Sequence, residues 1–428
     1  MMKFTASGDA LIQYRVPPDH ASFKSIGEFI KQGDARITNL ETVLSNFECF
    51  ASSYCGGTWL NANPDVLDDL ISYGFNMYAW ANNHTMDYSH DGLVSTKRAL
   101  DAKHLAHAGA GLSLFEASQP TSISTKAGRV AFISQCSSFV DAARAGNPNG
   151  SIPARPGLNP LRFSIEHTVT SEQLNVLKEI AKLTFVNGRK PISRAQGYTL
   201  LPPEGCFDFG GAIFREGEVP GRISKVNEID MKRTEEGIKS ALLNNEYVIV
   251  CFHSHQDKAN LDTEPDYFIE EYSHRCIEAG AAAVIGTGTH QVRGIEIYQG
   301  KPIFYSLGNF IFQSDSPAQM PADFNERYGF PKHLSVQKSI KLRNEIGTGG
   351  LHGSPIYFRS ILPYWEMEGN QLKKLLLMPI DLGFHESHGK QGLPLPTQPK
   401  DIIDYMREVS APYGTSFQIV DDLIEVSV

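Results

Sequence analysis

Carboxylate, amide and imidazole side chains directly follow apolar runs at several places in this sequence, where strands are expected to end. In an α/β sheet the carboxyl ends of the strands converge on one crevice, so side chains placed there meet although they lie far apart in the chain. Mixed oxygen and nitrogen ligands suit a divalent ion such as manganese, iron or zinc. The residues that we expect to meet are Asp9, Glu41, Asn83, His84, His253, His255 and His290.

The histidines of this set carry the most specific signal. His253 and His255 stand two residues apart after the apolar run 248–252, so an extended backbone points both rings to the same side. His290 follows the glycine-containing segment 286–289, whose backbone can approach a ligand closely. Taken singly, the histidine pair can also be an ordinary surface pair, Asp9 a turn residue and Glu41 a solvated acid. Together the residues indicate a metal centre.

Four arginines are candidates for binding a carboxylate or phosphate of the substrate through bidentate contacts. They are Arg15, Arg155, Arg162 and Arg293. We expect the segment 155–162 to form a wall of the substrate site, with an ordinary structural loop as the alternative.

Alternating helices and strands are expected to hold these residues in place, as in a layered α/β fold. The segment at about 140–230 is rich in loop-forming residues and predicts an insertion that forms a wall or lid of the site. Beyond residue 312 we expect irregular chain with a helix only near 400–407. The other expected elements are helices at 19–31, from 64 onward, at 91–103, 231–243 and 266–279, strands at 247–252 and 283–285, and hairpins at 122–134 and 294–305.

Composition excludes several classes of protein. A chain of 428 residues with 41% hydrophobic residues is globular, and its net charge of -9 argues against nucleic-acid binding. No apolar run approaches the length of a membrane span, and the amino terminus lacks the pattern of a signal peptide, so we expect no membrane anchor and a cytoplasmic location. The 6 cysteines are scattered and are expected to be reduced. Neither a dinucleotide fingerprint, a phosphate loop nor a nucleophile elbow is present.

The chain resembles the CapA, or poly-γ-glutamate synthesis (PGA_cap), family, whose fold is that of the calcineurin-like metallophosphoesterases. The resemblance implies a four-layer αββα sandwich over residues 1–312, including the insertion, with residues 313–428 as a C-terminal extension that packs on the same domain. The motifs that carry it are Gly8-Asp9, Asn39-Leu40-Glu41, Asn82-Asn83-His84 with Asp87 and Gly92, the segment 107–111, Gly294-Ile295-Glu296 and the segment 305–310.

The resemblance also implies roles for individual residues. Asp9, Glu41 and His290 would hold one ion, and Glu41 would bridge to a second ion held by Asn83, His253 and His255. His84 would be the general acid beside the metals. The chain departs from the phosphoesterase pattern at Leu11 and Thr287, where relatives carry histidines, and from the CapA pattern at His253-Ser254-His255. These departures leave both the number of ions, one or two, and the reaction open.

Three functions are consistent with these residues and with the family resemblance. The first is a divalent-metal-dependent hydrolase that cleaves an amide, in polyglutamate or a peptide, or a phosphoester. The second is a metal-dependent peptide epimerase with Asp9 and His290 as the acid–base pair at Cα. The third is a non-catalytic protein of capsule biosynthesis that binds polyglutamate or a peptide.

Overall fold

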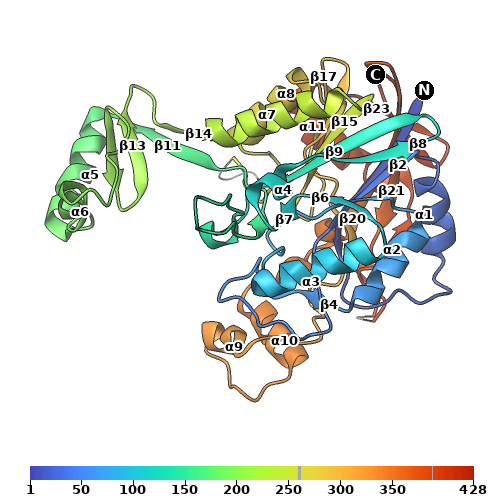
Figure 1. Ribbon diagram of the computed structural model, residues 1–428, viewed down its shortest axis with the longest axis horizontal. Helices are drawn as coiled ribbons and strands as arrows, with labels where there is room; N and C mark the ends of the chain where they lie inside the picture. The colour runs from blue at the N-terminus through green and yellow to red at the C-terminus, as the bar shows by residue number, and fades with distance from the viewer. Residues whose placement is uncertain (259–261, 388) are drawn as a thin grey trace.

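The computed structural model describes residues 1–258, 262–387 and 389–428, and it is a mixed α/β protein. Two large sheets, one of 10 strands and one of 6 strands, carry most of the chain (Figure 1). The smaller sheet has the order β17-β18-β16-β15-β9-β8, with hairpins at its two edges. Its strands are β8 (Thr121–Thr125), β9 (Gly128–Cys136), β15 (Tyr247–His253), β16 (Ala283–Thr287), β17 (Ile295–Tyr298) and β18 (Lys301–Phe304).

The larger sheet is built around β1 (Met2–Leu11), which pairs in parallel with β2 (Ala35–Leu40). β1 changes its other neighbour along its length: residues 2–5 pair with β20 (Arg359–Glu368), and residues 9–11 pair with β19 (Asn309–Phe312). The remaining strands are β5 (Met77–Ala79) and β6 (Ala106–Ala108) on one side, and β21 (Gln371–Asp381), β22 (Leu395–Pro396), β23 (Phe417–Val420) and β24 (Leu423–Val426) on the other.

Strand β15 shows how the layers pack. Ile249 and Cys251 belong to the same apolar core as Phe4 of β1, so this core joins the two large sheets. Val248 and Val250, on the opposite face of β15, belong to a core shared with helices α7 (Glu228–Leu242) and α8 (Tyr267–Glu278). Because both faces of β15 are buried, the strand is a continuous apolar run. A further core joins the larger sheet to α1 (Ser22–Ile30), α2 (Leu67–Tyr73) and α3 (Ser89–Ala102).

Most of the predicted elements are confirmed, with shifted ends. The helix expected at 19–31 is α1, the helix expected at 91–103 is α3, and the strand expected at 247–252 is β15. The predicted hairpin at 294–305 is β17–β18, whose turn residues Gln299 and Gly300 have φ of 50° and 73°. Positive φ at both turn residues matches the twist of a two-residue hairpin. Among the described residues, no helix is both long enough and apolar enough to span a bilayer.

The expectation of a loop-rich insertion is wrong for residues 163–226. They form a four-stranded sheet with two helices, which extends away from the large sheets (Figure 1). Helix α5 buries only Leu174 and Ala181, so its sequence lacks a strong apolar period. The elements are β11 (Phe163–Val169), α5 (Ser171–Thr184), α6 (Lys190–Ala195), β12 (Cys206–Phe209), β13 (Ala212–Glu216) and β14 (Gly221–Val226).

The expectation of an irregular chain beyond residue 312 is also wrong. Strands β20 and β21 form a long hairpin in the larger sheet, and Pro363 lies within β20. A proline argues against a central strand, but β20 pairs with β1 only from Tyr364 to Met367, so no bond to β1 is lost at Pro363. The same region contains α9 (Ala322–Tyr328), α10 (Val336–Ile346) and α11 (Ile403–Ser410), of which only the last was expected, near 400–407.

The remaining short elements connect these layers. β3 (Val43–Leu44) pairs with β4 (Asn61–Ala62), and β7 (Ala110–Gly111) pairs with β10 (Gly157–Leu158), next to α4 (Leu114–Ser118). Strand β3 follows β2 in the chain, and β7 follows β6.

Candidate metal centre

The carboxyl ends of β1, β2, β5, β15 and β16 meet, and their polar side chains form one buried cluster. Two groups in the cluster have ligand atoms that all lie within 4.8 Å of one another. The first group is Asp9, Glu41 and His290, and the second is Glu41, His253 and His255. Glu41 is common to both groups. The structure therefore brings together side chains that can hold a metal ion, and it places Glu41 between the two sets.

Glu41 is fully buried, and neither of its carboxylate oxygens has a hydrogen-bond partner among the described residues. Its Oε1 lies 3.8 Å from Nε2 of His84, 3.7 Å from Nε2 of His253 and 4.0 Å from Nε2 of His290. Burial, followed by the charge of Asp9, raises the pKa of Glu41 well above its ordinary value. A buried carboxylate without partners is costly, and a cation at this point would remove the cost.

Asp9 is buried beside Glu41 in a different environment. Its Oδ1 accepts a hydrogen bond from Nδ2 of Asn39 at 2.7 Å, and its Oδ2 accepts one from the backbone N–H of Gly288 at 2.9 Å. Burial raises the pKa of Asp9, but hydrogen bonds and charges from His253 and His290 outweigh it and hold the pKa well below the ordinary value. The surroundings therefore favour the ionised form of Asp9 and disfavour the ionised form of Glu41.

The surroundings of His253 and His255 favour the neutral imidazole, which is the form that binds a metal ion. Burial is the largest cause of the lowered pKa of each ring. Nε2 of His253 lies 2.9 Å from Oδ1 of Asn83, and Nε2 of His255 is buried without a hydrogen-bond partner among the described residues. Ligand atoms bonded to one ion at about 2.1 Å lie about 3.0–4.2 Å apart. The distances of 3.7 Å and 4.0 Å from Oε1 of Glu41 to Nε2 of His253 and of His290 fall within this range.

A hydrogen bond to Asn309 fixes the ring of His290. It adopts a left-handed conformation, with φ of 60°, directly after the glycine-containing end of β16. Its Nδ1 lies 2.9 Å from Oδ1 of Asn309 and 3.5 Å from Oδ2 of Asp9. Asn309, the first residue of β19, is a contact of His290 that we did not single out from the sequence, although it lies in the motif 305–310.

His84 forms a dyad with Asp87. Its Nδ1 lies 2.6 Å from Oδ2 of Asp87, and its Nε2 points toward Glu41. Asp87 accepts further hydrogen bonds from the backbone N–H groups of Gly56 and Leu60, both at 2.9 Å. Burial raises the pKa of Asp87, although the charge of His84 opposes the shift. The dyad fixes the orientation of the ring and leaves Nε2 available for proton transfer.

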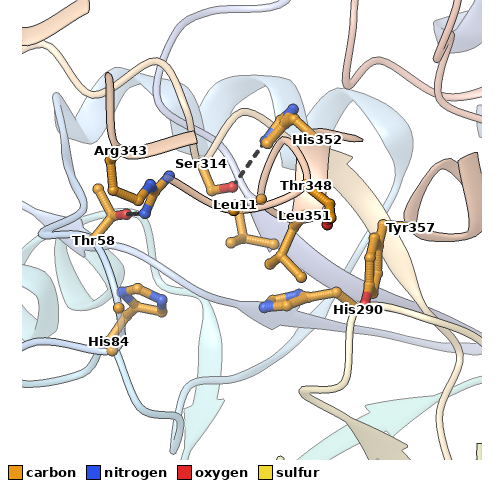
Figure 2. Close-up of a pocket in the computed structure, with 14 residues that line it drawn as sticks. Leu11, Thr58, His84, His290, Ser314, Arg343, Thr348, Leu351, His352 and Tyr357 are labelled. Carbon is orange, nitrogen blue, oxygen red and sulfur yellow. Dashed lines mark hydrogen bonds between the residues drawn. The ribbon is translucent and has the colours of Figure 1, made fainter. Parts of the chain in front are cut away.

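A cavity of about 490 Å³ lies over this cluster (Figure 2). His84 and His290 lie at its floor, and Leu11, the residue at one of the missing histidine positions, is part of its lining. Asp9 and Glu41 are not lining residues and lie behind the imidazoles. The upper lining comes from the C-terminal region, including Arg343, Thr348, Leu351, His352 and Tyr357.

None of the four predicted substrate-binding arginines lines this cavity. Arg15 forms a bidentate pair with Asp69, and Arg162 forms one with Asp230. Arg155 is exposed and donates to the carbonyl of Arg144. Arg293 is buried, its acceptors among the described residues are all backbone carbonyls, and burial lowers its pKa to about 10.

Segment 155–162 contributes β10 and no lining residue of this cavity. The arginine that does line it is Arg343, which we did not single out from the sequence. Its only local signal is its place before the glycine-rich segment 347–350.

Comparison with known proteins gives a family and several relatives. The family described as "Bacterial capsule synthesis protein PGA_cap" matches residues 3–314. The uncharacterized proteins y4sH and y4uA of Sinorhizobium fredii (strain NBRC 101917 / NGR234) are each 31% identical over 430 residues, which covers 97% of this chain and 91% of each relative. The PGA biosynthesis protein CapA of Bacillus subtilis (strain 168) is 33% identical over 135 residues, which covers 31% of this chain and 33% of that protein.

A solved structure is also similar. The crystal structure of a hypothetical protein from Thermus thermophilus aligns with a TM-score of 0.41 and 12% identity, covering 89% of this chain and 99% of that chain.

Proposed function

Because the chain belongs to the family of bacterial capsule synthesis proteins PGA_cap, we propose that it is a divalent-metal-dependent hydrolase. Its substrate would be an amide, in polyglutamate or a peptide, or a phosphoester. The observation that carries the proposal is Glu41, a fully buried carboxylate with neither oxygen hydrogen-bonded among the described residues, surrounded by imidazoles. Such a group is expected where a metal ligand is required, because an unpaired buried charge otherwise destabilises the fold.

We also propose that the layers form the αββα sandwich of the calcineurin-like metallophosphoesterases. Three apolar cores support this arrangement: one between the two large sheets, and one between each sheet and its own helices. Ligands at the carboxyl ends of strands follow from such layering, because helices and loops leave one edge of both sheets open to a common crevice.

The proposed ligand roles follow the two groups of residues described above. Asp9, Glu41 and His290 would hold one ion, and Glu41, Asn83, His253 and His255 would hold the second. When bound, divalent ions polarise the reacting group and make a coordinated water more acidic. With Leu11 and Thr287 at two positions where phosphoesterases carry histidines, the site as a whole would have fewer nitrogen ligands.

His84 would be the general acid. Its ring is held by Asp87, it lines the cavity, and its Nε2 can deliver a proton to the leaving group of the bond that water cleaves. The apolar side chain of Leu11 would exclude additional water from the same part of the cavity.

Metal analysis of the purified protein tests the metal-dependent part. The wild type and Glu28→Gln, which changes an exposed acid on α1, are expected to hold stoichiometric divalent metal, whereas Glu41→Gln is expected to hold little. A wild-type protein without stoichiometric metal after loading with manganese, iron and zinc would refute the proposal.

Peptide epimerisation is the second candidate, favoured by the way His84 and His290 both reach the cavity floor (Figure 2). The pair expected from the sequence is Asp9 and His290. Because Asp9 does not line the cavity, we propose His84, beside His290 at the floor, as the second group that would remove or return the Cα proton. Incubation with polyglutamate, test peptides and a bis-aryl phosphodiester in deuterium oxide separates the reactions. Cleavage supports hydrolysis, deuterium at Cα without cleavage supports epimerisation, and binding alone supports the non-catalytic alternative.

A further inference from the structure

We propose that Arg343 anchors a carboxylate of the substrate, so that this cavity takes a carboxylate-bearing molecule with its reacting bond over His84 and His290. The inference rests on the proposed function for the reacting bond and extends it to the class of substrate. Arg343 belongs to α10 and lies outside residues 3–314, which match the family. A recognition residue there would give this chain a specificity that is not contained in the family's shared motifs.

The positive charge of Arg343 is not paired with a carboxylate of any described residue. Its Nε donates to Oδ1 of Asn344 at 2.9 Å and its Nη1 donates to Oγ1 of Thr58 at 3.0 Å, and both acceptors are neutral. It forms no ion pair with any of the described residues, whereas the partly buried Arg162 and Arg222 each bind a carboxylate. A guanidinium has five N–H donors in a fixed fork, so the remaining donors of Arg343 are available to a ligand.

The position of Arg343 is held by packing. Ile340, one turn earlier on α10, packs in an apolar core with Trp59 and Tyr88. Thr58 accepts the hydrogen bond from Arg343 and is two residues from Gly56 in the chain. Gly56 in turn lies against His84, because a Cβ on Gly56 would be 2.8 Å from the His84 ring. Arg343 therefore lies at the His84 end of the cavity, as Figure 2 shows.

The lining of the cavity favours an anion. Among the described residues that line it there is no aspartate or glutamate, and Arg343 is its one permanently charged side chain. The remaining lining is imidazole, hydroxyl, glycine and apolar, with Leu11, Leu351 and Tyr357 able to contact methylene groups. An anion is attracted by Arg343, and no carboxylate faces it from the described lining. The nearest carboxylates, of Glu41, Asp87 and Asp315, lie behind the imidazoles of His84 and His352.

A carboxylate fits this lining better than a phosphate does. A phosphate carries more negative charge and three acceptor oxygens, and it is usually bound by several cationic groups or backbone donors. The lining described here offers a single guanidinium, and one guanidinium matches the charge and planar shape of one carboxylate. A cavity of about 490 Å³ holds a ligand of roughly dipeptide to tripeptide size.

The test measures binding rather than turnover. Zinc- or manganese-loaded wild type, Arg343→Gln, Arg343→Lys and the control Arg98→Gln, an exposed arginine on α3, are titrated calorimetrically. The probes are a γ-linked triglutamate, the same peptide with its carboxyls amidated, and inorganic phosphate. Metal content and thermal melting of each variant are measured beside the titrations, so a folding defect or metal loss is seen directly.

We expect Arg343→Gln to weaken binding of the free triglutamate about 10- to 100-fold, the loss expected for a charge-assisted hydrogen bond. We expect no change for the amidated peptide or in Arg98→Gln, and partial recovery in Arg343→Lys. Equal weakening of both peptides, no weakening, no binding of triglutamate by the wild type, or dependence on Arg343 for phosphate alone would each overturn the proposal. If the wild type lacks metal yet binds triglutamate through Arg343, the proposed hydrolase fails while this inference stands.

Discussion

The side-chain amide of Asn309 decides which nitrogen of His290 faces the candidate metal centre. Nδ2 of Asn309 donates to the carbonyls of His290 at 3.0 Å and Tyr357 at 2.9 Å, so its Oδ1 is the atom that faces the ring. Nδ1 of His290 must then be the donor in the 2.9 Å contact, which leaves the lone pair on Nε2, the nitrogen 4.0 Å from Glu41. At metal sites, an outer-shell residue commonly accepts a hydrogen bond from a ligand histidine in this way and fixes the orientation of its ring.

Replacing Asn309 is therefore expected to weaken metal binding without touching a ligand. We predict that Asn309→Ala lowers the affinity for zinc or manganese about 10- to 100-fold, the usual effect of losing an orienting partner. Competition with a chromophoric chelator measures it, with Asn244→Ala, an exposed asparagine after α7, as the control. Unchanged affinity in Asn309→Ala would show that the ring of His290 needs no such support.

Glu41 is expected to make the metal-free protein less stable as the pH rises. Its pKa is raised in the fold by burial and by Asp9, so its contribution is favourable at low pH and is lost as the pH rises toward the raised value. In chelator, Glu41→Gln should therefore gain stability over the wild type between pH 5 and pH 8, by about 1–3 kcal/mol. Urea unfolding at the two pH values measures the difference, and parallel curves for the two proteins would contradict the prediction.

His84 is expected to act in the reaction and not in metal binding. We predict that His84→Gln keeps the wild-type metal content but lowers kcat about 10²- to 10⁴-fold, the usual contribution of a general acid. Turnover of the substrate found in the hydrolysis screen and elemental analysis of the same samples measure both quantities. His90→Gln, which alters an exposed histidine on α3, should change neither, and loss of metal in His84→Gln would reassign the residue to the ligand shell.

Gly8 is expected to tolerate no side chain. A Cβ at this position would lie 1.8 Å from the carbonyl oxygen of Gly308, at the point where β1 changes its neighbour from β20 to β19. We predict that Gly8→Ala costs at least about 1–3 kcal/mol, because two backbones must separate, and that it displaces Asp9. Gly221→Ala, whose Cβ meets nothing within 4 Å, is the control in thermal unfolding. Equal melting of the two variants would contradict the prediction.

Much of the candidate site was predictable because its strand-end residues carry a local signal. Asp9, Glu41 and His253 lie at or directly after buried apolar strands, and parallel strands place their carboxyl ends at one edge whatever their separation in the chain. Asn309 was not singled out because its role depends on a contact with His290 across 19 residues. No local pattern distinguishes such an asparagine from one in an ordinary strand.

The fold was predictable where the sequence alternates clearly between apolar and polar residues. It was not predictable where an element is buried on both faces or hardly buried at all, because the alternation is then weak. β20 contains Pro363 and is buried on most of its length, so it lacks the alternation of a half-exposed strand. The unit at 163–226 has the opposite property, because a small sheet with two helices buries few side chains and its apolar periods stay weak. Both expectations failed for reasons of packing rather than of local propensity.

Residue types and their spacing were sufficient to predict which strand-end side chains meet and to show the family resemblance, because sheet geometry converts position along a strand into position in space. They were not sufficient to choose among the arginines. Arg15 and Arg162 are neutralised by Asp69 and Asp230, and Arg343 is left with neutral partners over the cavity. The charge state of an arginine's surroundings depends on residues brought to it by folding, so its availability to a substrate is a property of the tertiary structure.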